Sequence, residues 1–238
     1  MRAVVLQPMY LPWIGYFGLV DIADVFVFYD DVQFVRQTWQ NRNRIKTRNG
    51  KPTWLTVPVR RAYGQKINEV MIDSSTGWES NHWERIRESY SKAPFFRQYR
   101  QVLESQYSKK WDHLADLNIS LTKELASALD LNLDKFEISS KRCISGEATQ
   151  RLINLLRSLD ANEYVSGPAA AAYIDVGKFR EAGFALYWYR PEHPVYPQLW
   201  GDFVPYLSVI DLVFNVGRRS SEVIRNAARN ALQRDPRT

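Results

Sequence analysis

The segment WQNRNRIK places three cations at alternating positions, Arg42, Arg44 and Lys46. Side chains two residues apart share one face of an extended chain, so these cations are expected to form a row. Arginine can hold a phosphate or a carboxylate through two parallel hydrogen bonds. Arg60 and Arg61, at the end of the expected partner strand, favour a binding face for a phosphorylated substrate over a solvated hairpin face.

A histidine in a proline-rich loop is the first candidate for moving a proton. His193 is followed by Pro194 and, three residues later, by Pro197. Such a loop is rigid and would hold an imidazole in place, as a general acid or base requires. A structural role in the loop is the alternative.

Asp211 is the second candidate, because it interrupts an apolar helical pattern. A carboxylate in such surroundings needs a partner, and Ser208 and Asn215 fall on the same helical face. The three residues together predict a buried polar site with Asp211 as its acid or base.

Large aromatic residues crowd the loop after the first expected strand. The stretch MYLPWIGYFG contains Tyr10, Trp13, Tyr16 and Phe17 around two prolines. Aromatic faces pack against flat rings and sugars, so Tyr10, Trp13 and Tyr16 are predicted to wall a ligand pocket. The alternative is that the loop plugs the end of a hydrophobic core.

Polar residues follow several expected strands, and ligands of open parallel sheets bind at the carboxyl ends of strands. Asp31 and Gln33 follow the second strand, Gly167 follows a later strand, and the loop RPEHPVYPQLWGDF follows the last. These loops are therefore predicted to converge on one edge of the sheet. The catalytic candidates are His193, Asp211 and Asp31, and the substrate-binding candidates are Gln7, Tyr10, Trp13, Tyr16, Gln33, Asn41, Arg42, Asn43, Arg44, Lys46, Arg60, Gly167, Tyr196, Gln198 and Asn215.

The elements that would position these residues alternate between strand and helix. Residues 2–31 read as a strand, a helix and a strand, and such a unit crosses over right-handed between parallel strands. An Asn-Gly pair at 49–50 marks a hairpin, with residues 65–73 as a possible third strand, and helical patterns fill 77–133. Strand–helix alternation resumes after residue 134.

This order predicts one α/β domain over residues 1–238. Its core is expected to be a three-layer, Rossmann-like, mostly parallel sheet of about five strands. Residues 39–133 would form an inserted antiparallel hairpin and helical segment.

Composition limits the class of protein. The chain has 238 residues, a net charge of +6 and a pI near 9.4, which favours an acidic ligand or partner. One cysteine cannot form an internal disulfide, and three histidines give no zinc cluster. The sequence contains no apolar run of membrane-spanning length and no signal peptide pattern, so a cytoplasmic location is expected.

No motif requires a cofactor, and no metal site is predicted. The phosphate loop GxxxxGK[ST], GxGxxG, GxSxG, HExxH and paired CxxC motifs do not occur. The expected partner is a phosphorylated or nucleotide-linked small molecule. An acidic carrier protein is a further expectation, and the sequence leaves the oligomeric state open.

Several long motifs resemble the WbqC-like protein family. They are QPMYLPWIGYFGLVDIADVFVFYDDVQF, WQNRNRIK, WLTVPV, SGPAAAAYI and HPVYPQLWGDFVPYLSVIDLVFNVG, and the resemblance runs from residue 3 to about 217. It implies a bacterial protein associated with surface-polysaccharide (O-antigen) gene clusters and implies no particular reaction.

A weaker similarity connects MYLPWIGYFGLV to the HxGH segment of pantothenate synthetase, with Trp13 and Tyr16 at the histidine positions and Gly15 kept. RRSSEVIR is similar to the SSTxIR signature of nucleotidylyltransferases. Without the two histidines, this resemblance implies a HIGH-type fold in which the loop binds a ring instead of a triphosphate.

Three functions remain open. The first is a transferase that acts on an activated amino sugar or nucleotide-linked sugar during polysaccharide assembly. The second is an ATP-binding, nucleotidylyltransferase-like ligase with Ser220 and Ser221 at a phosphate-binding helix start. The third is a nucleic-acid-binding module that uses Trp39 and Trp54; it is the weakest, because the cations are scattered among acids.

Overall fold

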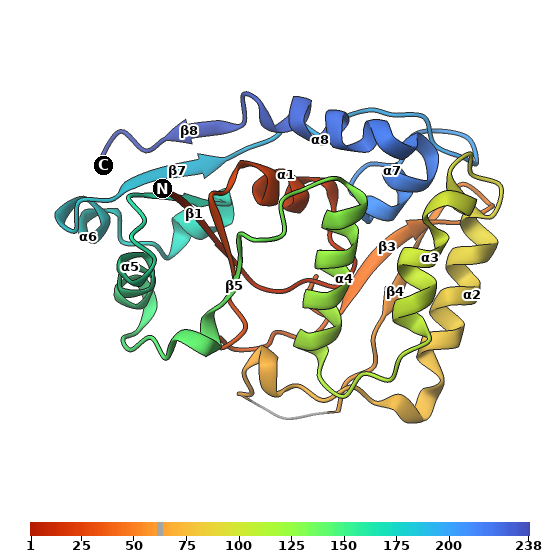
Figure 1. The fold of residues 1–238 in the computed structure, drawn as a ribbon, viewed down its shortest axis with the longest axis horizontal. Helices are drawn as coiled ribbons and strands as arrows, with labels where there is room; N and C mark the ends of the chain where they lie inside the picture. Colours follow the sequence, from red (N-terminus) through yellow and green to blue (C-terminus); the bar gives the residue numbers. More distant parts are fainter. Residues whose placement is uncertain (61–63) are drawn as a thin grey trace.

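A computed structural model describes residues 1–60 and 64–238 of the chain. Six strands within these residues form one sheet in the order β5-β2-β1-β6-β7-β8 (Figure 1). The first five are parallel and β8 is antiparallel to β7, which confirms the predicted, mostly parallel α/β sheet. The strands are β1 (Arg2–Leu6), β2 (Val25–Phe28), β5 (Phe136–Ile138), β6 (Glu163–Ser166), β7 (Ala185–Tyr189) and β8 (Leu232–Arg234).

β1 lies at the point where the strand order reverses. Its residue Val4 pairs with Phe26 of β2 on one side and with Val165 of β6 on the other. The connections after these strands leave the sheet in opposite directions, and this opens a crevice at the carboxyl ends of the strands.

Alternating side chains of the sheet pack into two layers of helices. Val4, Phe26 and Phe28 belong to one buried cluster, whereas Ala3 and Val5 belong to another, as the two-residue period of a strand requires. The first cluster contains residues of α1 (Ile14–Ile22), α4 (Leu114–Ala128), α7 (Val209–Val216) and α8 (Ser220–Ala228), and the second contains residues of α5 (Ala148–Ser158) and α6 (Val176–Glu181).

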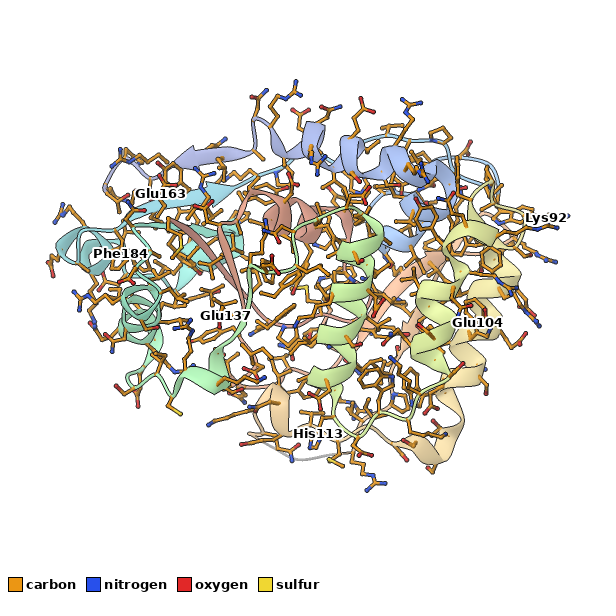
Figure 2. The ribbon with its side chains drawn as sticks, in the orientation of Figure 1. Lys92, Glu104, His113, Glu137, Glu163 and Phe184 are labelled. Carbon is orange, nitrogen blue, oxygen red and sulfur yellow. The ribbon has the colours of Figure 1, made fainter. Side chains whose placement is uncertain are left out.

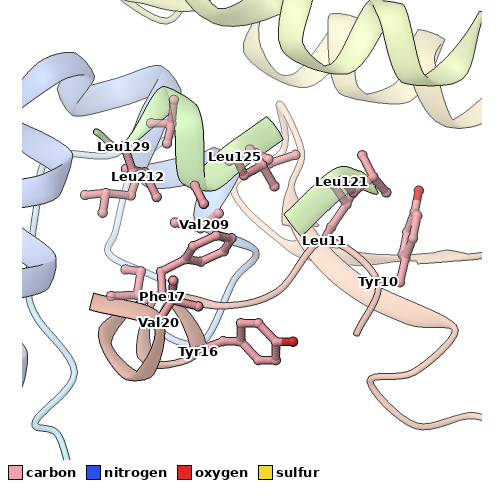
Figure 3. Close-up of a cluster of buried hydrophobic side chains, with 14 of the residues drawn as sticks. Tyr10, Leu11, Tyr16, Phe17, Val20, Leu121, Leu125, Leu129, Val209 and Leu212 are labelled. Atoms are coloured by element: carbon pink, nitrogen blue, oxygen red, sulfur yellow. The ribbon is translucent and has the colours of Figure 1, made fainter. Parts of the chain in front are cut away.

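The contact between α1 and α4 shows how the larger layer is held (Figure 3). Phe17 and Val20 of α1 pack in one cluster with Leu125 of α4 and with Leu129, the residue that follows α4. Leu212 of α7 closes the same cluster. Helix α1, which contains the end of the aromatic loop segment, is therefore fixed to the centre of the core. This restricts where the aromatic loop can lie.

The insertion begins with a hairpin outside the main sheet, as predicted. β3 (Arg42–Lys46) and β4 (Pro52–Thr56) pair antiparallel, and the turn between them contains Gly50 at φ +77°. The possible third strand at 65–73 is not formed, because Ile67–Glu69 is a 3-10 turn and Met71 and Ile72 make only isolated bridges, to His113 and Val59. Helices α2 (Trp78–Tyr90) and α3 (Phe96–Tyr107) follow.

The insertion shares the larger core cluster through Ile45, Leu55 and Tyr90. Figure 2 shows Lys92 and Glu104 on the insertion side of the molecule and Glu163 and Phe184 on the sheet side. Further short 3-10 turns are Ser74–Thr76, Ser139–Arg142, Pro168–Ala172 and Gly217–Arg219. Among the described residues, no helix has the length and apolar character needed to cross a membrane.

Gly217, between α7 and α8, tests how tightly the insertion is packed on the main core. Its backbone lies at φ +65° and ψ −135°, and an added Cβ would come within 2.4 Å of the Phe95 ring. We expect Gly217→Ala to lower the free energy of unfolding by about 2–4 kcal/mol, from backbone strain and overpacking together.

Gly183→Ala is the matched control in urea denaturation, because Gly183 also has positive φ but has no atom within 4 Å of the added Cβ. It should cost only about 1 kcal/mol. Equal losses in the two variants would show that Phe95 does not press on Gly217.

Candidate functional site

A cavity of about 1410 Å³ lies at the carboxyl ends of the parallel strands. We call it the strand-end cavity. It is lined by Gln7 after β1, Asp31 after β2, Ser140 after β5, and Ser166 and Gly167 at the end of β6. Its position at the reversal of strand order is the usual ligand site of such sheets.

Two of the three predicted aromatic residues line this cavity. Trp13 is partly buried and Tyr16 is buried, with its hydroxyl 3.4 Å from the backbone oxygen of Gln7. Tyr173, in the segment after β6, also lines it and is 71% exposed. The cavity therefore offers both fixed and accessible aromatic rings.

Gly15 explains how the Trp13 side chain is placed. A Cβ at residue 15 would lie 2.2–2.6 Å from three atoms of the Trp13 six-membered ring, so the indole rests directly on the backbone of the first turn of α1. Any larger residue at position 15 would push the ring away. The glycine keeps the aromatic ring at the helix start that faces the cavity.

Tyr10 does not wall the cavity, contrary to the prediction. It is fully buried, its hydroxyl lies 2.8 Å from Nδ1 of His82, and it also makes a short contact with the Tyr107 hydroxyl. Burial raises the pKa of this tyrosine well above its ordinary value. For Tyr10, the alternative of a core plug is the better description.

A polar network forms one side of the cavity. Arg151 of α5 makes an ion pair with Asp31, and its guanidinium carbon lies 5.0 Å from the centre of the Tyr29 ring. The Ser139 hydroxyl lies 2.5 Å from Oδ1 of Asp31 and 2.9 Å from Oδ1 of Asp30, and it can donate to one of them at a time. The network fixes a guanidinium and a carboxylate at the cavity wall.

The charges in this network change the affinity of Arg151 for its proton. Burial alone would lower its pKa, but the hydrogen bond to Asp31 and the nearby negative charge raise it above the ordinary value. Arg151 is therefore a permanent cation. Lys66 and Glu69 add one charge of each sign at the rim, where both are exposed.

The three cations of the hairpin are not at the cavity, so their predicted role in phosphate binding there is corrected. Arg42 and Arg44 lie over Trp54, at 4.3 and 5.6 Å from its ring centre. Arg44 also donates to the backbone oxygen of Tyr206 over 3.2 Å. Lys46 is fully buried and donates to the backbone oxygen of Asp202 over 2.5 Å.

The asparagines of the same segment serve the backbone. Asn41 donates to the Val57 oxygen over 3.1 Å, and Asn43 donates to the Leu11 oxygen over 2.6 Å. Both are buried, and neither lines the cavity. Asn43 fastens the hairpin to the aromatic loop, and Asn41 ties the two sides of the hairpin together. Both are structural uses of residues predicted to bind substrate.

Some of the remaining predicted binding residues line the strand-end cavity, and others do not. Gln7 and Gln33 line the cavity, and the Gln7 side-chain oxygen accepts a 2.7 Å hydrogen bond from Gln40. Arg60 is exposed, and its backbone N–H donates to Met71. Arg61 lies outside the described residues.

His193 lies against the aromatic loop but does not line the strand-end cavity. Its ring stacks on Trp13 at a centroid distance of 6.4 Å, and Nε2 accepts a 3.0 Å hydrogen bond from the Tyr206 backbone N–H. Nδ1 lies 3.0 Å from the Pro194 oxygen, to which it donates in the neutral tautomer. Both ring nitrogens are therefore engaged, and the geometry supports positioning of Trp13 instead of proton transfer.

Asp211 is buried below the loop that contains His193. Its Oδ2 accepts a 2.9 Å hydrogen bond from the Tyr90 hydroxyl. Burial raises its pKa to about 6, although the Tyr90 hydrogen bond and the charge of Lys46 act in the opposite direction. Asn215 donates to the backbone oxygen of Asp211 over 2.7 Å.

Tyr196 and Gln198 belong to the same buried region and do not line the cavity. Gln198 accepts from the Val204 N–H and donates to the Val204 oxygen, which closes the loop. The Tyr196 hydroxyl and Oδ1 of Asp211 have no hydrogen-bond partner among the described residues. The region is a polar core beneath the loop, separate from the strand-end cavity.

The sequence did not lead us to predict the polar group around Arg151 at the cavity wall. Arg151, Ser139 and Ser140 follow β5, which pairs with β2 at the edge of the sheet. The segment GEATQR after the strand KFEIS could have predicted it, because a polar loop and a helix start that follow a parallel strand lie at the same edge of the sheet.

No cluster of three or more His, Cys, Asp or Glu side chains suited to a metal occurs in the described part of the chain.

The raised pKa of Asp211 predicts a pH dependence of stability. Its folded-state pKa of about 6 lies above the ordinary aspartate pKa of 3.8, so the native protein binds this proton more tightly than the unfolded chain. Stability from this group is complete below pH 3.8 and is lost as pH rises through 6, by up to about 3 kcal/mol.

Asp211→Asn removes this titration, so its free energy of unfolding relative to wild type should rise between pH 4 and pH 7 in urea denaturation. The exposed Asp116→Asn is the control. A constant difference between Asp211→Asn and wild type across this range would contradict the assigned burial.

Comparison with known proteins adds the family. The model of the WbqC-like protein family matches residues 7–223. An uncharacterized protein of Mycobacterium tuberculosis, Rv1507c, is 37% identical over 228 residues, which cover 94% of this chain and 97% of that protein. No solved structure matches the chain. The strand-end cavity described above is thus a feature of a chain that belongs to the WbqC-like protein family.

Proposed function

We propose that the protein is a transferase of bacterial surface-polysaccharide or related biosynthesis that binds a nucleotide-linked sugar in the strand-end cavity. One observation carries this proposal: the cavity combines a fixed guanidinium, Arg151, with the aromatic rings of Trp13 and Tyr173 at the reversal of strand order. A nucleotide-linked sugar presents the matching groups, which are two phosphates, a base and a sugar ring.

The size of the cavity suits this ligand. Pockets for small ligands measure roughly 300–1,000 Å³, and about 1410 Å³ leaves room for a second, small reactant beside the nucleotide sugar. The two substrates of a transfer reaction must be held together. Asp31, held by Arg151 and Ser139, is a carboxylate in the cavity lining that can accept a proton from an attacking hydroxyl or amine.

One observation supports the ATP-binding alternative, and another argues against it. Nucleotides also bind at this position of doubly wound sheets. However, Ser220 and Ser221 are buried at the start of α8, where Ser221 donates to the Leu129 oxygen over 2.7 Å. Neither serine lines the cavity, so the expected phosphate site at that helix has no support.

Trp13 is expected to hold a ring of the ligand. Trp13→Ala should weaken binding of UDP-N-acetylglucosamine by roughly 1–3 kcal/mol, the usual scale for losing a stacked ring, and Trp13→Phe should recover part of it. Isothermal titration calorimetry with UDP-N-acetylglucosamine, ATP and oligothymidylate measures this. Tighter binding of ATP than of UDP-N-acetylglucosamine would favour the ligase. An unchanged affinity of Trp13→Ala for UDP-N-acetylglucosamine would show that Trp13 does not pack on a ring of the ligand.

Arg151 is expected to hold the phosphates. Arg151→Met should lower the affinity for UDP-N-acetylglucosamine about 10–100-fold, the scale of a charge-assisted hydrogen bond, and should change the affinity for N-acetylglucosamine little. Arg157→Met, on the same helix but exposed and outside the cavity, is the matched control. If Arg157→Met loses as much affinity for UDP-N-acetylglucosamine as Arg151→Met, the loss comes from the change in net charge and not from a direct contact with the phosphates.

A further inference from the structure

A second hollow lies on the insertion, between β4 and α2. It measures about 410 Å³ and is lined by Trp54, Thr56, Thr76, Trp78, Asn81 and Arg85, among others. We call it the hairpin groove. It shares no lining residue with the strand-end cavity, and in Figure 1 β4 and α2 lie on the side of the molecule opposite to α5.

Trp54 is held in place although much of it is exposed. It is 40% exposed, while the guanidinium carbon of Arg42 lies 4.3 Å from its ring centre and the Trp39 ring lies 5.5 Å away. Arg85 of α2 donates to its backbone oxygen over 3.3 Å. A rigid, accessible indole at the edge of a hollow is a ready surface for the flat face of another ring.

One hydrogen-bond donor in the lining of the groove has no partner. Nε1 of Trp78 is buried and has no acceptor among the residues that the structure describes. Trp78 itself is only 4% exposed and lines the groove. Buried donors without an acceptor are costly, so a ligand rich in oxygen acceptors is the chemical complement of this site.

The rest of the lining narrows the class of ligand. Thr56, Thr76 and Asn81 are exposed and provide hydroxyl and amide groups that both donate and accept. Such groups match the hydroxyls of a sugar ring. The guanidinium of Arg85 adds a cation that matches a carboxylate.

We propose that the hairpin groove is a saccharide-binding site that takes an acidic sugar unit. The sugar ring would pack on Trp54, its hydroxyls would bond Thr56, Thr76 and Asn81, and its carboxylate would face Arg85. The groove volume of about 410 Å³ lies within the range of small-ligand pockets, roughly 300–1,000 Å³. This proposal is independent of the one for the strand-end cavity, because the two sites have no residue in common.

A single-stranded nucleic acid is the competing ligand. Sequence-independent binding of such strands needs a cationic groove that tracks the backbone over about 4–16 nucleotides. The hairpin groove is short, and Thr56, Thr76 and Asn81 in its lining are neutral. Its composition therefore favours a sugar.

The test is calorimetric titration of the full chain with a tetrasaccharide of alternating glucuronic acid and N-acetylglucosamine. Its carboxyl-reduced, neutral form and oligothymidylate are the other probes. We expect the acidic form to bind at least about tenfold more tightly than the neutral form. Trp54→Ala should lower that affinity about 5–150-fold and leave the binding of UDP-N-acetylglucosamine unchanged.

Arg85→Gln and Arg87→Gln form a matched pair on one helix, because Arg85 lines the groove and Arg87 is exposed outside it. Only Arg85→Gln should reduce the preference for the acidic form. Thermal melting checks folding, and Trp54→Phe replaces Trp54→Ala if the latter melts early. Binding of oligothymidylate alone, equal binding of the acidic and neutral forms, or affinity that does not depend on Trp54 would each overturn the proposal.

Discussion

β1 forms parallel ladders with β2 on one side and with β6 on the other, and the strand-end cavity opens where these ladders end. Strands in this arrangement must have their carboxyl ends at one edge, and the connections that leave it cannot fill the space between them. Asp31, Gly167 and Trp13 come from separate parts of the chain and meet for this reason alone. The Arg151–Asp31 ion pair depends in addition on β5, which pairs with β2.

The aromatic loop connects the cavity to the rest of the molecule. Trp13 rests on Gly15, stacks on His193 and forms an isolated backbone bridge with Ser208. Ser208 caps the N-terminus of α7, whose Asp211 lies in the polar core below the loop. The Trp13 ring at the cavity is thus packed against His193, which does not line the cavity itself, and neither does Asp211.

The fold was accessible from the sequence because its signals are local. The alternation of strand and helix, Asn49-Gly50 and the crossover rule were enough for the parallel sheet and the hairpin. Trp13 and Asp31 could be placed at the strand-end cavity because they lie in the loops that follow β1 and β2. Arg151 was missed because its place depends on β5 pairing with β2, and strand order is not a local property. Tyr10 and Lys46 were misplaced because sequence patterns do not reveal that His82 and Asp202 lie beside them.

We propose that the strand-end cavity binds a nucleotide-linked sugar through Arg151 and Trp13. A crystal structure of the protein with UDP-N-acetylglucosamine is the decisive measurement. We expect ligand density in the cavity, with a ring against Trp13 and phosphate oxygens in hydrogen-bond contact with Arg151. Density only outside the cavity, or an empty cavity at a saturating concentration of the ligand, would contradict it.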